Sequence, residues 1–384
     1  MSTCLSRFPN LLVAAFVVMG SLCLPAHALA APFQADSQEQ DTQDREEPES
    51  DRPEREIIPF PVILSDPTNG FGAGGGLLTL YKLNETAPKD SQTAVFGYYT
   101  TTSSWKWGFQ QVLSFAEDRF RSTTTGVFGN TNNSFSYTDL PLNVAYGQRQ
   151  NRLETDFTYN VFSDLFVGVT YRYAGTEFLF DVGSEEEQEF SEAILGIAGA
   201  EDTTDSGIGI VVVFDSRDRQ YTPTGGAFAN FRYLDYGKWL GSDNNYRTVD
   251  TFFNYYYGFI PGHLLAFRFR WRNASGEVPF TGQSTFEGVD LRAYPTGKYR
   301  GTGTLAGQVE YRFNAWKRLG GVVFGGSGRV YGGEPTLGAD EILPSGGAGV
   351  RFLLLKDRGT QVGLDYARGR FGNQGIYFFF DEAF

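Results

Sequence analysis

The sequence predicts an all-β fold, a transmembrane antiparallel β-barrel of about 16 strands. Three observations lead to this prediction. Strand-sized segments alternate between apolar and polar residues, an export signal stands at the N-terminus, and the chain ends on an aromatic strand. Each is typical of a protein that is exported and then crosses a membrane with strands.

The segment 264–273 shows the alternation most clearly. Its apolar face carries Leu265, Phe267, Phe269 and Trp271. Its other face carries Ala266, Arg268, Arg270 and Arg272. Period two indicates a strand, and a membrane barrel would turn the apolar face to lipid and the arginines to the lumen. The segment 308–314 alternates in the same way and places Glu310 on the lumen side.

The N-terminus predicts a secretory signal over residues 1–30. Arg7 precedes an apolar run over 11–24, and small residues around Ala28 offer a cleavage site. The run is too short for a membrane-spanning helix. A lipoprotein signal is less favoured because the bulky Leu22 stands before Cys23.

Both cysteines, Cys4 and Cys23, lie inside this signal. The mature chain is therefore predicted to have no thiol, no disulfide and no thiolate metal site.

The C-terminal strand ends in aromatic residues. Gly375, Phe378, Phe380 and the terminal Phe384 look like the signal by which outer-membrane barrels are recognised for insertion. The alternative is an ordinary apolar last strand.

Composition agrees with a barrel. Aromatic residues make up 16% of the chain, and 47 residues are glycine. Mean hydropathy is −0.29, and no run of about 18 apolar residues follows the signal, which excludes a helical membrane protein. Alternation keeps the mean hydropathy of a barrel low.

The net charge is −13, and residues 33–56 hold ten acids and three arginines, which give −7 of it. We expect a disordered acidic leader over 31–56 and a barrel over 57–384. A dedicated binding arm is the less favoured interpretation of the leader.

Strand-sized segments separated by turn residues fill the barrel region. They are predicted at 70–82, 92–102, 105–115, 119–128, 135–148, 152–162, 165–178, 207–215, 226–236, 248–259, 263–273, 303–315, 320–331, 346–354, 360–368 and 373–380. The segment 135–148 is the weakest strand. Short turns at 160–164 and 258–262 are predicted to be periplasmic. Long loops at 181–206, 237–245 and 273–302 are predicted to be extracellular, with the acidic stretch 185–192 as a solvated cap.

A cationic and aromatic stretch, residues 291–301, precedes the last five strands. Its sequence is Leu-Arg-Ala-Tyr-Pro-Thr-Gly-Lys-Tyr-Arg-Gly, and Pro295 and Gly297 predict a tight turn. It resembles the sixth-loop motif of the BamA/TamA-like bacterial surface antigen superfamily. The matching residues are Leu291, Arg292, Tyr294, Gly297, Arg300 and Gly301.

Other stretches extend the resemblance over residues 57–384. The segment 214–225, with Asp215, Arg217 and Asp218, resembles a turn motif of the family. The segment 61–76 is similar to the start of its first strand, and 346–384 to its closing hairpin and final strand.

The resemblance implies that the 291–301 loop folds back into the lumen, where its arginine pairs with acids on the strands. Arg292 matches that arginine and Glu310 matches an acid, so we expect the two to interact with Tyr294 packed beside them. Ala293 replaces the motif glycine, which an extended backbone would tolerate. Gly326 stands where the family often has a second acid, so the sequence predicts one lumenal partner for Arg292.

The resemblance also sets an expectation about domains. Family members with insertase or secretion roles carry periplasmic POTRA domains, and the 26 residues of the leader leave no room for one. This weakens the inference of insertase function. Within the barrel, Gly72, Gly74, Gly75 and Gly375 are predicted to weaken the seam between first and last strands.

Other chemistry finds little support in the sequence. Residues 70–75 spell G-x-G-x-x-G, but no helix follows, so a dinucleotide site is disfavoured. His263 stands beside a short turn, away from the outer rim, and Asp215, Arg217 and Asp218 suit a structural turn. We predict no enzyme activity, catalytic residue, cofactor, metal or nucleic-acid partner.

Three functions stay open for a barrel in the outer membrane of a Gram-negative bacterium. The first is assembly or translocation of outer-membrane proteins or lipid. The second is a passive pore. The third is a structural barrel that depends on partner proteins. Outer-membrane lipids are the expected surroundings, and the oligomeric state is not predicted.

Overall fold

The computed structural model describes residues 55–384, apart from 67–68, 84–90, 137–142, 180–184, 198, 220–221, 333–340, 356–359 and 381–383. The predicted signal, 1–30, and all but the last two residues of the predicted leader lie outside the described residues. Residues 55 and 56 belong to the first strand.

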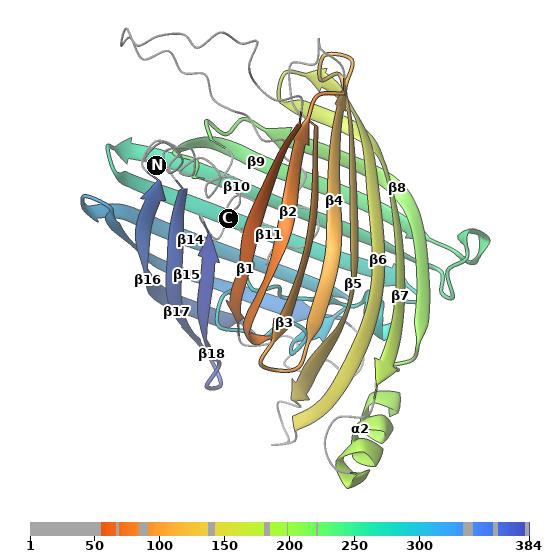
Figure 1. Ribbon diagram of the computed structural model, residues 1–384. Helices are drawn as coiled ribbons and strands as arrows, with labels where there is room; N and C mark the ends of the chain where they lie inside the picture. Colours follow the sequence, from red (N-terminus) through yellow and green to blue (C-terminus); the bar gives the residue numbers. More distant parts are fainter. Residues whose placement is uncertain are drawn as a thin grey trace, which may run out of the picture.

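Sixteen antiparallel strands close into one barrel (Figure 1). Each strand pairs with its neighbours in the chain, β11 pairs with β14, and β1 closes the barrel against β18. The strands are β1 (Arg55–Asp66), β2 (Gly70–Tyr81), β3 (Ser91–Thr100), β4 (Trp105–Phe115), β5 (Phe120–Ser136), β6 (Asn143–Phe162), β7 (Leu165–Leu179), β8 (Thr203–Asp215), β9 (Gly225–Tyr236), β10 (Tyr246–Ile260), β11 (His263–Gly276), β14 (Gly303–Trp316), β15 (Leu319–Tyr331), β16 (Leu343–Leu355), β17 (Thr360–Gly369) and β18 (Gln374–Phe380).

The remaining elements lie in the connections. The helix α2 (Glu185–Ile197) stands beyond one end of the barrel in Figure 1, in the loop predicted as an acidic cap. Short elements are η2 (Lys238–Leu240), η3 (Phe280–Gly282), β12 (Ser284–Thr285) and β13 (Arg300–Gly301). Among the described residues, no helix has the length and apolar character needed to cross a membrane.

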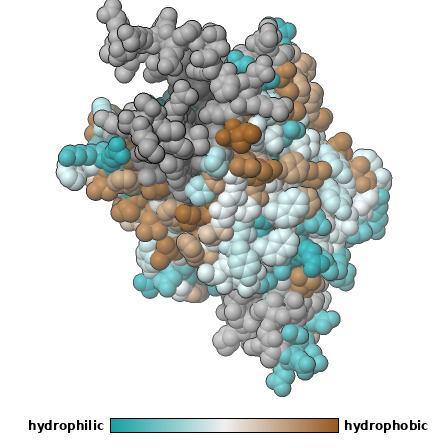
Figure 2. All heavy atoms as spheres, in the orientation of Figure 1, coloured by the Kyte–Doolittle hydropathy of each residue, from teal (hydrophilic) through white to brown (hydrophobic). Residues whose placement is uncertain are grey.

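Side chains alternate between the lumen and the outer surface as predicted. On β11, Phe267 and Phe269 are exposed on the outside, whereas Arg268 and Arg270 are buried inside. An outer-membrane barrel turns this outer surface to lipid. Figure 2 shows brown and pale residues over the outside of the strands and strongly hydrophilic ones toward the ends, as at α2.

The predicted strand 135–148 is wrong. Residues up to Ser136 continue β5, and β6 begins at Asn143, which pairs with Ser136. The segment 130–136 reads Asn-Thr-Asn-Asn-Ser-Phe-Ser, so the strand continues where apolar alternation has already stopped. The structure instead adds β1, and the two errors cancel in the strand count. Two prolines, Pro59 and Pro61, obscure β1 in the sequence because proline lacks an amide donor.

The seam between β1 and β18 is weakly paired. Only Ser65 and Phe378 form a ladder pair there among the described residues, against seven pairs between β17 and β18. Gly72 and Gly75, predicted at the seam, lie on β2, one strand away from it. Gly375 does lie on β18, where it pairs with Ala367 of β17.

Cysteine cross-linking tests this assignment of the seam. Ser65→Cys with Phe378→Cys should form a disulfide in membranes, because antiparallel ladder partners have Cα atoms about 4.5–5.5 Å apart. Gly72→Cys with Gly375→Cys should not, because β1 lies between their strands. Gel mobility with and without reductant shows which pair forms a disulfide. A disulfide in the Gly72/Gly375 pair and none in the Ser65/Phe378 pair would disprove the assignment.

Candidate functional site

The connection from β11 to β14 folds into the barrel lumen. Leu291, Arg292, Ala293 and Tyr294 are fully buried, with no exposed surface. The loop closes on itself through β12 and β13, where Thr285 pairs with Arg300. The inward-folded loop that the sequence predicts is therefore present.

Arg292 bridges two carboxylates on the barrel wall. Its Nη2 contacts Glu310 of β14, and its Nη1 lies 2.5 Å from Asp365 of β17. Both acids have no exposed side-chain surface. The guanidinium also lies 3.5 Å from the ring centroid of Phe324. The predicted contact with Glu310 is present, and the expectation of a single acidic partner is wrong because Asp365 is the second.

Two further arginines complete this cluster. Arg312 Nη2 lies 2.6 Å from Glu310, and Arg351 Nη1 lies 2.5 Å from Asp365. Buried carboxylates need such partners because water is excluded from them. The loop arginine thus completes a network that spans β14, β16 and β17.

Ala293 adopts a backbone conformation that favours glycine. Its φ is 91°, so the expectation of an extended backbone is wrong. The neighbouring contacts hold it there, since the Ala293 amide donates to the Tyr377 hydroxyl of β18 at 2.7 Å. The Ser345 hydroxyl donates to the carbonyl of Arg292. The motif glycine would fit this position without strain.

The rest of the loop binds the end of the barrel near the β17–β18 turn. The Tyr294 hydroxyl donates to the Pro344 carbonyl at 2.6 Å and accepts from the Arg370 amide at 2.9 Å. Asn373 donates to the Tyr299 hydroxyl at 2.7 Å and accepts from Lys298 at 2.8 Å. Tyr294 is thus buried, with its hydroxyl directed to this turn.

The turn residues of the motif shape the loop itself. Gly297 has a φ of 84°, and its amide donates to Thr285 Oγ1 at 2.8 Å. Arg300 donates to the Phe280 carbonyl at 2.9 Å and stacks 4.0 Å from the Phe280 ring. Gly301 leaves no space for a side chain, since a Cβ would lie 2.6 Å from the Tyr331 carbonyl oxygen.

Asp290 anchors the loop to β11. It lies 2.8 Å from Arg268 and 2.7 Å from Arg272, both of which the sequence predicts in the lumen. Burial raises the pKa of Asp290, but the charges of Arg272, Arg268 and Arg270 outweigh it and hold the pKa well below its usual range. The neighbouring guanidinium groups therefore favour the ionised form of this carboxyl.

A second charged cluster on the lumen wall was missed by the sequence analysis. Arg232 of β9 is 1% exposed and contacts Glu154 and Asp156 of β6. Arg172 of β7 lies 2.6 Å from Glu154. The sequence pattern could have predicted this cluster, because Glu154 and Asp156 occupy alternate positions within one strand and so share a face.

The turn motif between β8 and β9 is a structural charge cluster. Arg217 Nε lies 2.7 Å from Asp215, and its guanidinium stacks 4.1 Å from Phe228. Asp218 accepts the amides of Thr224 at 2.8 Å and Gly225 at 3.0 Å. These contacts close the turn.

The aromatic residues of the predicted C-terminal signal lie in different surroundings. Phe378 is partly buried near the seam, and the side chain of Phe380 lies outside the described residues. Phe384 is buried inside the barrel, where its carbonyl accepts from Arg312 at 2.9 Å. Its ring lies 5.3 Å from the Arg312 guanidinium and 5.6 Å from that of Arg268.

No group of three or more histidines, cysteines or acids suited to a metal occurs among the described residues. His263, predicted to lack a catalytic role, lies 2.6 Å from the Tyr311 hydroxyl beside the β10–β11 turn. The charged clusters are suited to holding the loop and the wall together.

We predict that Arg292→Ala lowers barrel stability by about 3–5 kcal/mol, because it leaves two buried carboxylates short of a counter-charge. The temperature at which heat-modifiable gel mobility is lost measures this. Arg149→Ala is the control, since Arg149 and Glu177 form a pair that is 50% and 49% exposed. An Arg292→Ala barrel as heat-resistant as the control would contradict the prediction.

The positive φ of Ala293 gives a second prediction. Ala293→Gly should be more stable than Ala306→Gly by about 1–2 kcal/mol, because only the first relieves a left-handed backbone. Both alanines are buried in the lumen, so both variants lose one buried methyl group. The same heat-modifiability assay compares them, and equal stabilities would rule out strain at Ala293.

Solved structures of known proteins share the barrel fold of this chain. BamA from Haemophilus ducreyi lacking POTRA domains 1–3 superposes with a TM-score of 0.59 at 16% identity, over 86% of this chain and 70% of that one. CdiB from Acinetobacter baumannii gives 0.54 at 11% identity, over 86% of this chain and 60% of that one. CdiB from Escherichia coli gives 0.55 at 9% identity, over 85% and 62%. The chain thus spans about three fifths of either CdiB.

These likenesses establish the fold. A comparison with curated protein sequences gives no match. A profile of the Omp85 superfamily domain matches residues 84–354. That segment covers well over half of the chain and contains both the inward-folded loop with Arg292 and the strand β14 with Glu310. The chain is therefore a Gram-negative outer-membrane β-barrel that belongs to the Omp85 superfamily.

Proposed function

We propose that this barrel assembles or translocates outer-membrane proteins, or lipid, by opening between β1 and β18. The observation that carries the proposal is that the described residues of these strands form one ladder pair, Ser65 with Phe378. A closed barrel has no free strand edge, so an incoming chain can pair only where two strands separate. The weakest junction is the place where separation is least costly.

The lumenal loop makes the two sides of this seam unequal. Tyr377 of β18 accepts a hydrogen bond from Ala293, and Arg292 connects the loop to β14 and β17. These contacts favour a rigid C-terminal side. The side that begins with β1 is the better candidate for movement.

The lumen face next to the seam is apolar. Phe60, Val62 and Leu64 of β1 pack with Leu78 of β2 and Phe96 of β3 in one buried cluster. Elsewhere the wall carries the arginine and acid clusters and a second buried apolar cluster on β7 to β10, which includes Val211 and Phe252. An apolar inner wall beside a weak seam suits a cargo with apolar side chains or acyl chains, such as an unfolded outer-membrane strand or a lipid.

Family resemblance supports the same class of function. Members of this superfamily with insertase or secretion roles work with POTRA domains, and the residues described here hold none outside the barrel. The proposal includes a partner protein that presents cargo to the barrel. Capture of that partner from membranes in mild detergent would identify it.

The alternative of a passive pore fits less well. Fully buried loop residues, including Arg292 and Tyr294, occupy the lumen and contact its wall. We expect low and unstable conductance in planar bilayers. A large, steady conductance from the wild-type barrel would favour the pore.

Locking the seam tests the proposal. Cells depleted of the native protein would express Ser65→Cys with Phe378→Cys, and the outer-membrane proteome and lipid profile would be measured with and without reductant. We expect loss of function when the disulfide forms and recovery on reduction. The control pair is Val309→Cys with Gly325→Cys, ladder partners on β14 and β15 away from the seam. Full function of the locked seam variant would contradict the proposal.

A further inference from the structure

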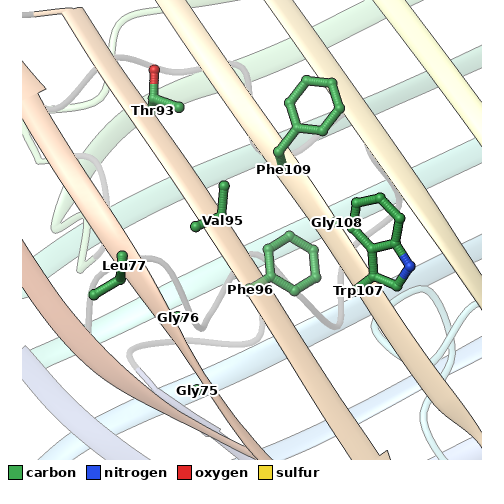
Figure 3. Close-up of a pocket in the computed structure, with 9 residues that line it drawn as sticks. All are labelled: Gly75, Gly76, Leu77, Thr93, Val95, Phe96, Trp107, Gly108 and Phe109. Carbon is green, nitrogen blue, oxygen red and sulfur yellow. The ribbon is translucent and has the colours of Figure 1, made fainter.

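A groove opens on the outer surface of β2, β3 and β4 (Figure 3). Its volume is about 490 Å³, which falls in the range of roughly 300–1,000 Å³ found for small-molecule sites. Its lining consists of glycines, apolar side chains and Thr93, and none of these residues is charged.

The strand register explains why the surface is hollow there. Gly75 pairs with Gly97, which pairs with Trp107, so two adjacent outward positions lack side chains. In the next row, Leu77, Val95 and Phe109 lie side by side and form apolar walls. Leu77, Val95 and Trp107 are 47%, 46% and 50% exposed, which places this face on the outside.

Backbone packing does not require the two outward glycines. A Cβ on Gly75 would meet the Phe60 carbonyl oxygen at 3.5 Å, and one on Gly97 would meet the Lys106 carbonyl oxygen at 3.5 Å. Both are ordinary contacts. By contrast, a Cβ on the inward Gly74 would lie 1.9 Å from the Gly97 carbonyl oxygen. Side chains at Gly75 and Gly97 would therefore fit against the backbone and would fill the hollow.

Polar side chains stand at one end of the groove. Tyr81 and Thr93 share a hydrogen bond of 3.1 Å between their hydroxyls. The Gln111 amide reaches Thr93 at 3.4 Å and Tyr81 at 3.5 Å. This end lies four residues along β2 from Gly75, about 13 Å at about 3.3 Å per residue. It belongs to the end of the barrel where β1 begins and β18 ends. This end is periplasmic because the longest connections, from β7 to β8 and from β11 to β14, lie at the opposite end.

We infer that this groove binds one acyl chain of a glycerophospholipid from the periplasmic leaflet, with the ester region of the lipid at Thr93, Gln111 and Tyr81. The outer surface of a membrane barrel faces hydrocarbon, so an acyl chain is the available occupant of an apolar hollow. Uncharged hydroxyl and amide groups complement ester carbonyls. A lipid of the opposite leaflet would meet the polar cluster at the wrong depth.

This site stands independently of the proposed function, because it requires neither seam opening nor a protein cargo. It does lie on the same glycine-rich side of the barrel as β1. Filling the groove changes lipid binding without touching the Arg292 cluster.

Lipid retention tests the inference. The barrel would be reconstituted in vesicles of phosphatidylethanolamine and phosphatidylglycerol, extracted in mild detergent, and analysed by native mass spectrometry. We expect wild type to retain one phospholipid. Gly97→Leu and Gly75→Leu should lower the retained fraction about tenfold, because the new side chains occupy the groove. Thr93→Val, which changes no volume, should lower it as well.

Gly307→Leu is the matched control. Gly307 faces outward on β14, and its Cβ would meet only the Arg268 carbonyl oxygen at 3.9 Å. Heat-modifiable mobility verifies that every variant is folded. Retention unchanged in folded Gly97→Leu and Thr93→Val barrels would overturn the inference. So would equal loss in Gly307→Leu, no retained lipid in wild type, or preferential retention of added lipopolysaccharide.

Discussion

The structure depends on one guanidinium held between two buried carboxylates. Glu310 and Asp365 have no exposed side-chain surface, and Arg292 contacts both. Either acid left without enough positive charge would be costly in a closed lumen. The loop must therefore enter the barrel, and its entry fixes β14 and β17 relative to each other. The same loop then reaches β18 through Ala293 and β11 through Asp290.

This anchoring divides the barrel into two unlike parts. Charged and polar contacts through the lumen stabilise the strands from β11 to β18. The strands from β1 to β3 instead carry an apolar inner wall, and the outer surface of β2, β3 and β4 is hollowed at Gly75 and Gly97. The seam between β1 and β18 lies where these parts meet, and among the described residues it has one ladder pair.

The sequence predicts most of the strands because period-two alternation is strong wherever one face meets lipid. Prediction of strands from the sequence fails where this alternation is absent. Pro59 and Pro61 obscure β1, and the polar ends of β5 and β6 read as a separate strand. The contact with Glu310 was predictable from the next strand, but Asp365 lies 73 residues from Arg292 and meets it only after the barrel closes. The positive φ of Ala293 arises from contacts to Tyr377 and Ser345, which local sequence does not reveal.

Residue-resolved amide hydrogen exchange in lipid nanodiscs tests most directly the claim that the seam is the soft junction of this barrel. We expect amides between β1 and β18 to exchange much faster than those between β17 and β18. Arg292→Ala should extend fast exchange into β18, because the loop no longer holds that side. Equal protection at the two junctions of β18 in the wild-type barrel would contradict the account.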